Sequence, residues 1–184
     1  MNIWINMILY QATWLTSVAG AGHGLWWPGL VALAAFAALQ LGLGPWRHAD
    51  ACLIAGVSVL GFVIDSTFVQ MGLMQFEAPV PWPALAPLWM VALWTSFALT
   101  LNHSLAFLQT RPLLAALLGG VGAPMAYWAA SRGWHALSFP LGVPLMFGTT
   151  ALAWALLMPL LARAALRLRV LDAAPAHSMT QAKP

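Results

Sequence analysis

Long apolar runs, separated by short groups of proline, glycine and charged residues, make up most of the chain. Six such runs cover residues 3–19, 25–43, 49–74, 85–108, 112–130 and 141–162. A helix needs about 20 predominantly apolar residues to cross a bilayer, and these runs are close to that length. The pattern therefore predicts an all-α membrane protein, built as a compact bundle of six transmembrane helices.

Composition supports this prediction. Hydrophobic residues make up 62% of the 184 positions and charged residues only 6%, whereas a soluble domain carries about 25% charged residues. So few charges cannot cover a water-facing surface, and the net charge of +3 gives no support to nucleic-acid binding. We expect one transmembrane domain, residues 1–170, followed by a disordered cytoplasmic tail, residues 171–184.

The basic residues predict the orientation, because cytoplasmic loops of membrane proteins are enriched in Lys and Arg. With six spans and a cytoplasmic N-terminus, six basic residues fall on the cytoplasmic side and only Arg132 falls outside. Both termini are therefore predicted to be cytoplasmic. The six cytoplasmic residues are Arg47, Arg111, Arg163, Arg167, Arg169 and Lys183.

One carboxylate stands within the third apolar run. Asp65 is the only charged residue among positions 54–74, and a charge at such a depth costs about 2.5–3.5 kcal/mol on insertion scales. Such residues face a bundle interior or a watery cavity and often mark functional sites, so Asp65 is the candidate catalytic residue. The alternative is a structural acid that is protonated and donates one hydrogen bond across the bundle.

Polar and aromatic residues of other runs are expected to line a pocket with Asp65. A rise of 1.5 Å per residue places Trp94, Thr95 and Tyr127 at the depth of Asp65, as an outer layer. The same arithmetic makes a direct pair between Asp65 and His103 improbable. A second layer, nearer the middle or the cytoplasmic face, is expected to contain Asn102, His103 and Gln11.

These second-layer residues also have a plainer interpretation. Asn102 can act as hydrogen-bonding glue between helices, and His103 can be an interior histidine with satisfied hydrogen bonds. A stripe of small residues in the fifth run, including Gly119, Gly122 and Ala126, predicts close helix packing. No metal-ligand spacing and no nucleotide-binding motif occurs, so no metal is predicted and the cofactor stays open.

The chain resembles a family of small, functionally uncharacterised multi-pass proteins of the bacterial inner membrane. Five segments carry the resemblance and together cover most of residues 1–130. They are Asn6…Gln11-Ala-Thr-Trp14, Gly61…Asp65, Pro81-Trp82-Pro83…Leu88-Trp89, Phe97-Ala-Leu-Thr-Leu-Asn102-His-Ser104 and Gly119-Gly-Val-Gly-Ala-Pro-Met-Ala-Tyr127. Genes of this family often lie near cyclopropane-fatty-acid-synthase-like methyltransferases and photolyase-like genes under stress regulation. The resemblance implies a role in membrane-lipid modification or oxidative-stress defence, and it provides no catalytic residues.

Three functions remain open at this point, and the sequence does not decide whether the protein is an enzyme. The first is an accessory protein or enzyme of membrane-lipid modification, with lipids as partners and Asp65 as acid, base or binding group. A pocket open sideways to acyl chains favours it. The second is a small proton-coupled transporter, favoured by a water path from Asp65 to the His103 layer. The third is a noncatalytic scaffold subunit that binds a membrane-protein partner through the stripe at Gly122.

Overall fold

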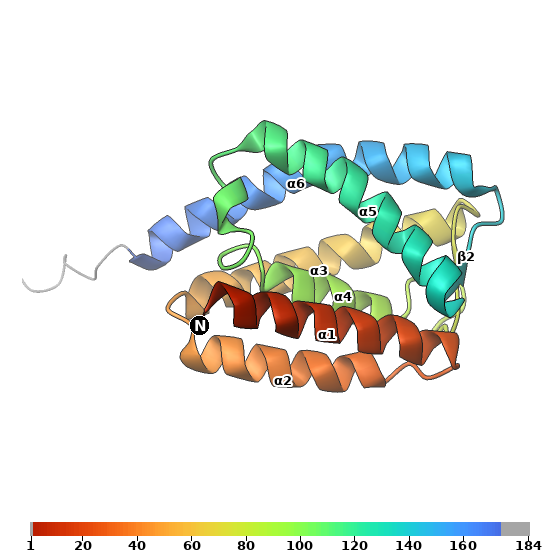
Figure 1. Ribbon diagram of the computed structural model, residues 1–184, viewed down its shortest axis with the longest axis horizontal. Helices are drawn as coiled ribbons and strands as arrows, with labels where there is room; N and C mark the ends of the chain where they lie inside the picture. The colour runs from red at the N-terminus through yellow and green to blue at the C-terminus, as the bar shows by residue number, and fades with distance from the viewer. Residues whose placement is uncertain (1, 174–184) are drawn as a thin grey trace, which may run out of the picture.

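The computed structural model describes residues 2–173, which form an all-helical chain with one short strand pair (Figure 1). Successive helices run back and forth along one axis (Figure 1). The helices are α1 (Ile3–Gly22), α2 (Pro28–Leu43), α3 (Arg47–Gln70), α4 (Leu88–Ala98), α5 (Pro112–Trp134) and α6 (Val143–Ala173), with the 3-10 turn η1 (Ala106–Leu108) and the strands β1 (Gln75–Phe76) and β2 (Leu137–Ser138).

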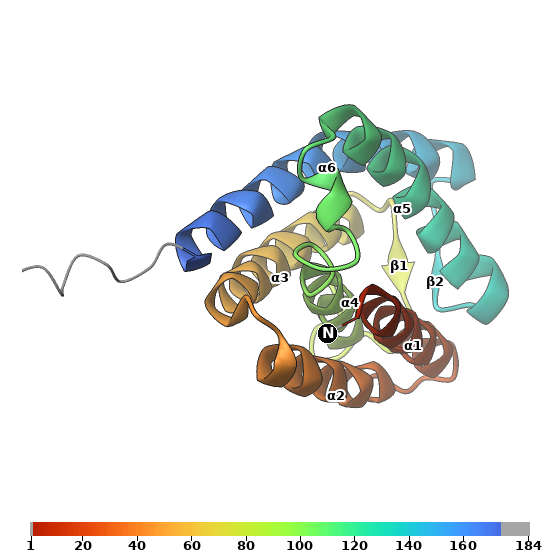
Figure 2. The ribbon, with the colours of Figure 1, turned by 60° about the vertical axis from the view of Figure 1, so that its left-hand side comes forward.

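Helix α4 lies at the centre of the bundle and contacts α1, α2 and α3. Helices α5 and α6 pack closely against each other; α6 also contacts α3, and α5 also contacts α1 (Figure 2). Their close approach depends on Gly119, because a Cβ atom added there would lie 2.5 Å from the carbonyl oxygen of Trp154. A site between α1, α4, α5 and α6 is thus enclosed by segments far apart in the sequence.

Both ends of the described chain lie at the same end of the bundle (Figure 1). The α2–α3 junction and the α4–α5 connection lie there too, whereas the α1–α2, α3–α4 and α5–α6 connections lie at the opposite end. At that opposite end β1 and β2 pair antiparallel, with Gln75 opposite Ser138 and Phe76 opposite Leu137. This small strand pair, which the sequence pattern does not predict, joins the α3–α4 loop to the α5–α6 loop.

The fourth predicted span differs from the structure. Helix α4 has 11 residues and ends at Ala98, and the buried chain continues to η1 through turns instead of helix. The hydroxyl of Thr100 donates to the Phe97 carbonyl. Two side-chain amides donate to further carbonyls of this segment: Asn6 to Leu99 O at 3.0 Å, and Gln109 to Leu101 O at 2.9 Å. Because side chains satisfy these backbone groups, the helix can end inside the bundle.

The other predicted spans lie on helices, with shifted ends. The largest shift concerns α6, which has 31 residues and passes through the basic segment from Arg163 to Arg169 before it ends at Ala173. Residues 171–173 are therefore helical, which corrects the predicted start of the tail. The rest of the predicted tail, residues 174–184, lies outside the described residues.

Three of the described helices are long and apolar enough to cross a membrane, namely α3, α5 and α6. Helices α2 and α4 are apolar but shorter. Large apolar side chains cover the outer surface of the bundle; Leu113, for example, is 81% exposed and Leu152 is 65% exposed. Such extensive exposed apolar surface is what a membrane protein presents to lipid.

Candidate functional site

Asp65 is fully buried on α3 and accepts hydrogen bonds from two aromatic side chains. The indole N–H of Trp94 on α4 donates to Oδ2 at 2.6 Å, and the hydroxyl of Tyr127 on α5 donates to Oδ1 at 2.7 Å. One carboxylate thus links three helices. The structure brings together three of the four residues expected in the outer layer.

Trp94 is held in place on several sides. Its ring lies against α3 at Gly61, where an added Cβ atom would be 2.1 Å from two ring atoms. Its other neighbours are Trp154 of α6, stacked with centroids 4.7 Å apart, and Phe97, edge-on at 6.5 Å. Such aromatic pairs contribute about 0.5–1.5 kcal/mol beyond their buried area. The orientation of Trp94 is therefore fixed by packing and by the bond to Asp65.

A cavity of about 540 Å³ lies on the far side of Trp94 and Tyr127, enclosed by α1, α4, α5 and α6. Its wall is mainly apolar, and Asp65 is not part of it. Asp65 therefore acts on the cavity through the two aromatic side chains that it fixes. Seven aromatic residues line the wall: Tyr10, Trp14, Trp89, Trp94, Phe97, Tyr127 and Trp154.

The cavity reaches the outer surface of the bundle between α1 and α5. Gln11 of α1 and Gly122, Leu118 and Met125 of α5 belong to its wall and are also exposed. An added Cβ atom at Gly122 would meet nothing within 4 Å. The rim therefore faces whatever surrounds the bundle, which for an apolar surface is lipid.

Several residues lie elsewhere than the sequence predicted. The Thr95 hydroxyl contacts Ser58 at 2.7 Å and does not bond to Asp65. Gln11 lines the cavity, as predicted, but at its exposed rim instead of in a polar layer with Asn102. Of the small stripe, Gly119 packs against α6 as predicted, but Gly122 and Ala126 line the cavity. Gly122 thus borders open space instead of allowing a contact with a helix of the bundle.

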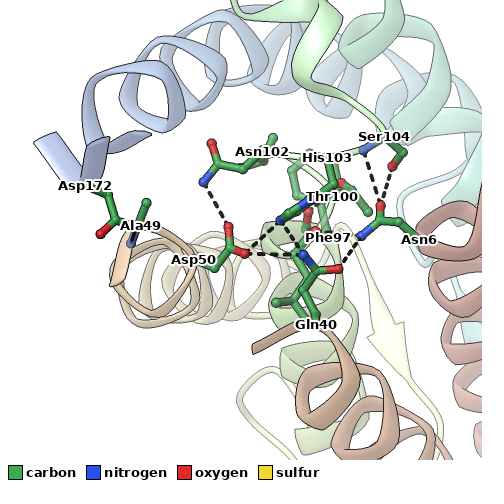
Figure 3. Close-up of polar contacts among 12 residues, drawn as sticks. Asn6, Gln40, Ala49, Asp50, Phe97, Thr100, Asn102, His103, Ser104 and Asp172 are labelled. Carbon is green, nitrogen blue, oxygen red and sulfur yellow. Dashed lines mark hydrogen bonds and ion pairs between the residues drawn. The ribbon is translucent and has the colours of Figure 1, made fainter. Parts of the chain in front are cut away.

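A second buried carboxylate, Asp50, lies in the first turn of α3 (Figure 3). Its Oδ2 is 2.8 Å from Nε2 of His103, and its Oδ1 accepts from the Asn102 amide at 2.9 Å. The Gln40 amide of α2 contacts both Asp50 Oδ2, at 3.5 Å, and His103 Nε2. Asp50 and His103 are the one carboxylate and basic side chain found in contact among the described residues, and they form an ion pair when the imidazole is protonated.

Side-chain amides extend the Asp50 cluster across the bundle in two directions, of which Figure 3 shows the one through Gln40 and Asn6. On one side Asn6 of α1 donates to Gln40 at 3.1 Å and accepts from the Ser104 hydroxyl at 2.6 Å. On the other side Gln109 donates to Asn102 at 3.1 Å. Arg169 of α6 donates to Gln109 at 3.3 Å. The cluster thus joins α1, α2, α3, α6 and the turns after α4 at one depth.

The family model for a protein of unknown function (DUF2878) matches residues 3–160. The chain belongs to the DUF2878 family. The match covers Asp50, Asp65 and the whole wall of the cavity, whereas Arg169 lies beyond it. No curated protein and no solved structure matches the chain. The function of this DUF2878 protein is therefore inferred from the geometry of its own helices and side chains.

The Asp50 cluster of this DUF2878 chain was missed by sequence reasoning, which grouped Asn102 and His103 with Gln11. Asp50 follows Arg47 and His48 at the start of an apolar run, where a carboxylate is expected to be solvated. A usable signal was present: Asn6, Gln40 and Asn102 are strongly polar residues near the same end of three other apolar runs. Polar residues at one depth in several spans predict a shared buried layer.

The two carboxylates offer different chemistry. Asp50 and Asp65 are fifteen residues apart, or about 22 Å along α3, and neither of them lines the cavity. No group of three His, Cys, Asp or Glu side chains suited to a metal ion occurs within residues 2–173. Asp65 can fix two aromatic groups at a ligand-sized cavity, whereas Asp50 ties five segments together.

Proposed function

We propose that this protein is a multi-pass protein of the bacterial inner membrane, with all six helices embedded in the bilayer and both termini in the cytoplasm. The apolar outer surface supports the first part. The short helix α4 is compatible with it, because non-helical backbone is tolerated at membrane depth when it is buried in protein. The described arginines support the orientation: five belong to the end of the bundle that holds both chain ends, and Arg132 to the opposite end.

Within this bundle, the cavity takes the alkyl chain of a membrane lipid, and the protein acts as an accessory or enzyme of membrane-lipid modification. The observation that carries this proposal is the lateral opening of an apolar, aromatic cavity between α1 and α5. Its volume of about 540 Å³ falls in the range of about 300–1,000 Å³ that ligand sites occupy. A lipid chain can enter from the bilayer without crossing water.

Tyr127 is the polar group that connects the cavity to Asp65, because it lines the cavity and its hydroxyl bonds to Asp65, which does not line it. Its hydroxyl proton is directed at Asp65, which leaves the oxygen lone pairs available as acceptors. Asp65 is therefore a positioning residue in this proposal. An enzymatic role would use the Tyr127 oxygen, and an accessory role would need only the cavity.

The alternatives receive less support. A transporter needs a polar route between the Asp65 and His103 layers, whereas the cavity has a mainly apolar wall that includes neither residue. A scaffold that docks a partner at Gly122 would use the same exposed surface, and the apolar cavity that opens beside Gly122 is what favours a lipid there.

Gly122→Leu tests the lipid proposal directly. The leucine side chain would grow into open space and fill the cavity without breaking a contact. Cells fed a diazirine-bearing fatty acid, which enters their phospholipids, should give cross-links on α1, α4 and α5 residues of the cavity in the wild type and few in Gly122→Leu. Gly148→Leu is the matched control, because Gly148 is also exposed with nothing within 4 Å but lies outside the cavity on α6.

The whole-cell fatty-acid profile gives the functional measurement. A deletion strain should show an altered fatty-acid profile. At matched expression, the wild-type gene and Gly148→Leu should return the profile to normal, whereas Gly122→Leu and Asp65→Asn should not. Cavity cross-links that persist in Gly122→Leu, or a profile unchanged by deletion under normal and oxidative conditions, would exclude the proposal.

A further inference from the structure

Within residues 2–173, Asp65 has no Lys, Arg or His partner. Its two oxygens accept from the Trp94 indole and the Tyr127 hydroxyl, which are both neutral. The contact of a carboxylate with a basic side chain found among residues 2–173 belongs to Asp50 and His103. A buried carboxylate is normally paired with a cation, because its removal from water is costly. The two buried acids therefore differ: Asp50 contacts the His103 imidazole at 2.8 Å, whereas Asp65 contacts no Lys, Arg or His side chain among the described residues.

The cavity next to Asp65 has the composition of a cation site. Among the described residues, no Lys, Arg or His side chain lines it, whereas seven aromatic side chains do. The N–H groups of Trp94 and Trp89 and the hydroxyl of Tyr127 are bonded to Asp65 and to the Glu77 carbonyl. The faces of such rings attract cations through their quadrupole. Hydrogen bonding to a carboxylate adds electron density to Trp94 and Tyr127, which strengthens that attraction.

We propose that the occupant of this cavity is an amphiphile with a quaternary-ammonium head, which lies near Trp94 and Tyr127 and serves as the counter-ion of Asp65. This inference rests on the proposed lipid-binding function and narrows the lipid to a cationic class. A quaternary head fits better than a primary amine for two reasons. It donates no hydrogen bonds, and both Asp65 oxygens already have donors. It is also weakly hydrated, so an apolar aromatic wall can replace its water.

Two photoprobes test the charge requirement on the purified full-length protein in dodecyl maltoside. One is dodecyltrimethylammonium with a diazirine on its chain, and the other is its uncharged isostere, in which carbon replaces nitrogen. Adducts on cavity residues are compared with adducts on lipid-facing residues of α2, which measure unspecific partitioning. We expect the cationic probe to label the cavity about tenfold more than the isostere. Equal labelling of the wild type by the two probes would overturn the inference.

The variants separate this inference from the lipid-binding proposal. Asp65→Asn, which keeps the shape of the side chain, should abolish the preference for the cation, and the exposed control Glu77→Gln should keep it. The wild-type comparison needs no variant and so stands even if Asp65→Asn folds poorly. If both probes label the cavity equally and Gly122→Leu blocks both, only the cationic class is wrong. If neither probe labels the cavity, the lipid-binding proposal falls as well.

Discussion

At the scale of single residues, the lack of a side chain at Gly61 determines where the Trp94 ring lies relative to Asp65. The Trp94 ring occupies the space that a Cβ atom would need, and only from there can its N–H reach Asp65 at 2.6 Å. The neighbouring layer depends in the same way on Asp50, whose two oxygens hold Asn102 and His103. Each buried acid fixes side chains that come from other segments.

Gly61→Ala should therefore displace Trp94 and break its bond to Asp65. We expect a loss of about 1–3 kcal/mol, from overpacking and from a buried carboxylate with one donor fewer. Thermal unfolding in detergent measures the effect. Gly56→Ala on the same helix is the control, because its Cβ atom meets nothing within 4 Å and helix propensity favours Ala over Gly by about 1 kcal/mol. Equal melting temperatures for the two variants would contradict this account of Trp94.

Asp50→Ala should destabilise the protein more strongly than any change at the surface of α3. It leaves the Asn102 and Gln40 amides and His103 buried without their acceptor, and each buried polar group left unsatisfied costs about 1–3 kcal/mol. The melting temperature should fall well below that of Cys52→Ala, two residues later and exposed. A melting curve like that of Cys52→Ala would show that the Asp50 cluster contributes little to stability.

At the scale of elements, the short helix α4 is the main departure from a simple bundle. Its end at Ala98 lets the chain fold through buried turns that bring Asn102, His103 and Gln109 onto the start of α3. The same segment places Leu105 and Leu108 in the cavity wall. The broken helix thus contributes to both the polar cluster and the cavity.

Gln109→Leu tests how this segment is held. It removes the donor to Leu101 O and the bond to Asn102, so a buried carbonyl loses its partner at a cost of about 1–3 kcal/mol. Amide hydrogen exchange should become faster across residues 99–109 and stay unchanged in α5 and α6. Thr110→Val, at the exposed neighbouring position, serves as control. Unchanged protection of these amides from hydrogen exchange in Gln109→Leu would mean that backbone interactions alone stabilise the turns.

At the scale of the whole molecule, the arrangement of the ends and the charges supports one orientation in the membrane. At the strand-pair end, Glu77 lies in the α3–α4 loop and Arg132 in the last turn of α5. The arginines of α6 lie in the C-terminal half of that helix, whose C-terminal end is at the opposite end of the bundle (Figure 1). A helix of 31 residues is about 46 Å long, which exceeds the hydrocarbon thickness of about 30 Å. The basic end of α6 can therefore reach the headgroup level.

The orientation can be measured with single cysteines, because Cys52 is the one natural cysteine. In a Cys52→Ala background, Glu77→Cys should react with a membrane-impermeant maleimide added outside intact inner-membrane spheroplasts. Thr110→Cys should react only after the membrane is opened. Both positions are exposed in the structure, so access to the reagent is limited only by the bilayer. The reverse labelling pattern would invert the proposed topology.

The sequence alone determined the helical class and most helix positions, because apolar runs of bilayer length and Pro or Gly breaks are local properties of the chain. It also singled out Asp65, and depth arithmetic placed Trp94 and Tyr127 at its level, since helical rise is nearly constant. No local property of the sequence predicts that α4 ends at Ala98. The carbonyls that follow this end are satisfied by the side chains of Asn6, which is far away in the sequence, and Gln109, which lies beyond the turns.

Only the tertiary structure decided where Asp65, Gly122 and His103 lie relative to the wall of the cavity. Asp65 lies behind the cavity instead of within it, Gly122 borders open space instead of a helix, and His103 pairs with Asp50. These facts depend on the rotation of each helix about its axis and on the close approach of α5 and α6. Periodicity along one chain segment contains neither quantity, because both arise from how side chains of different helices pack together.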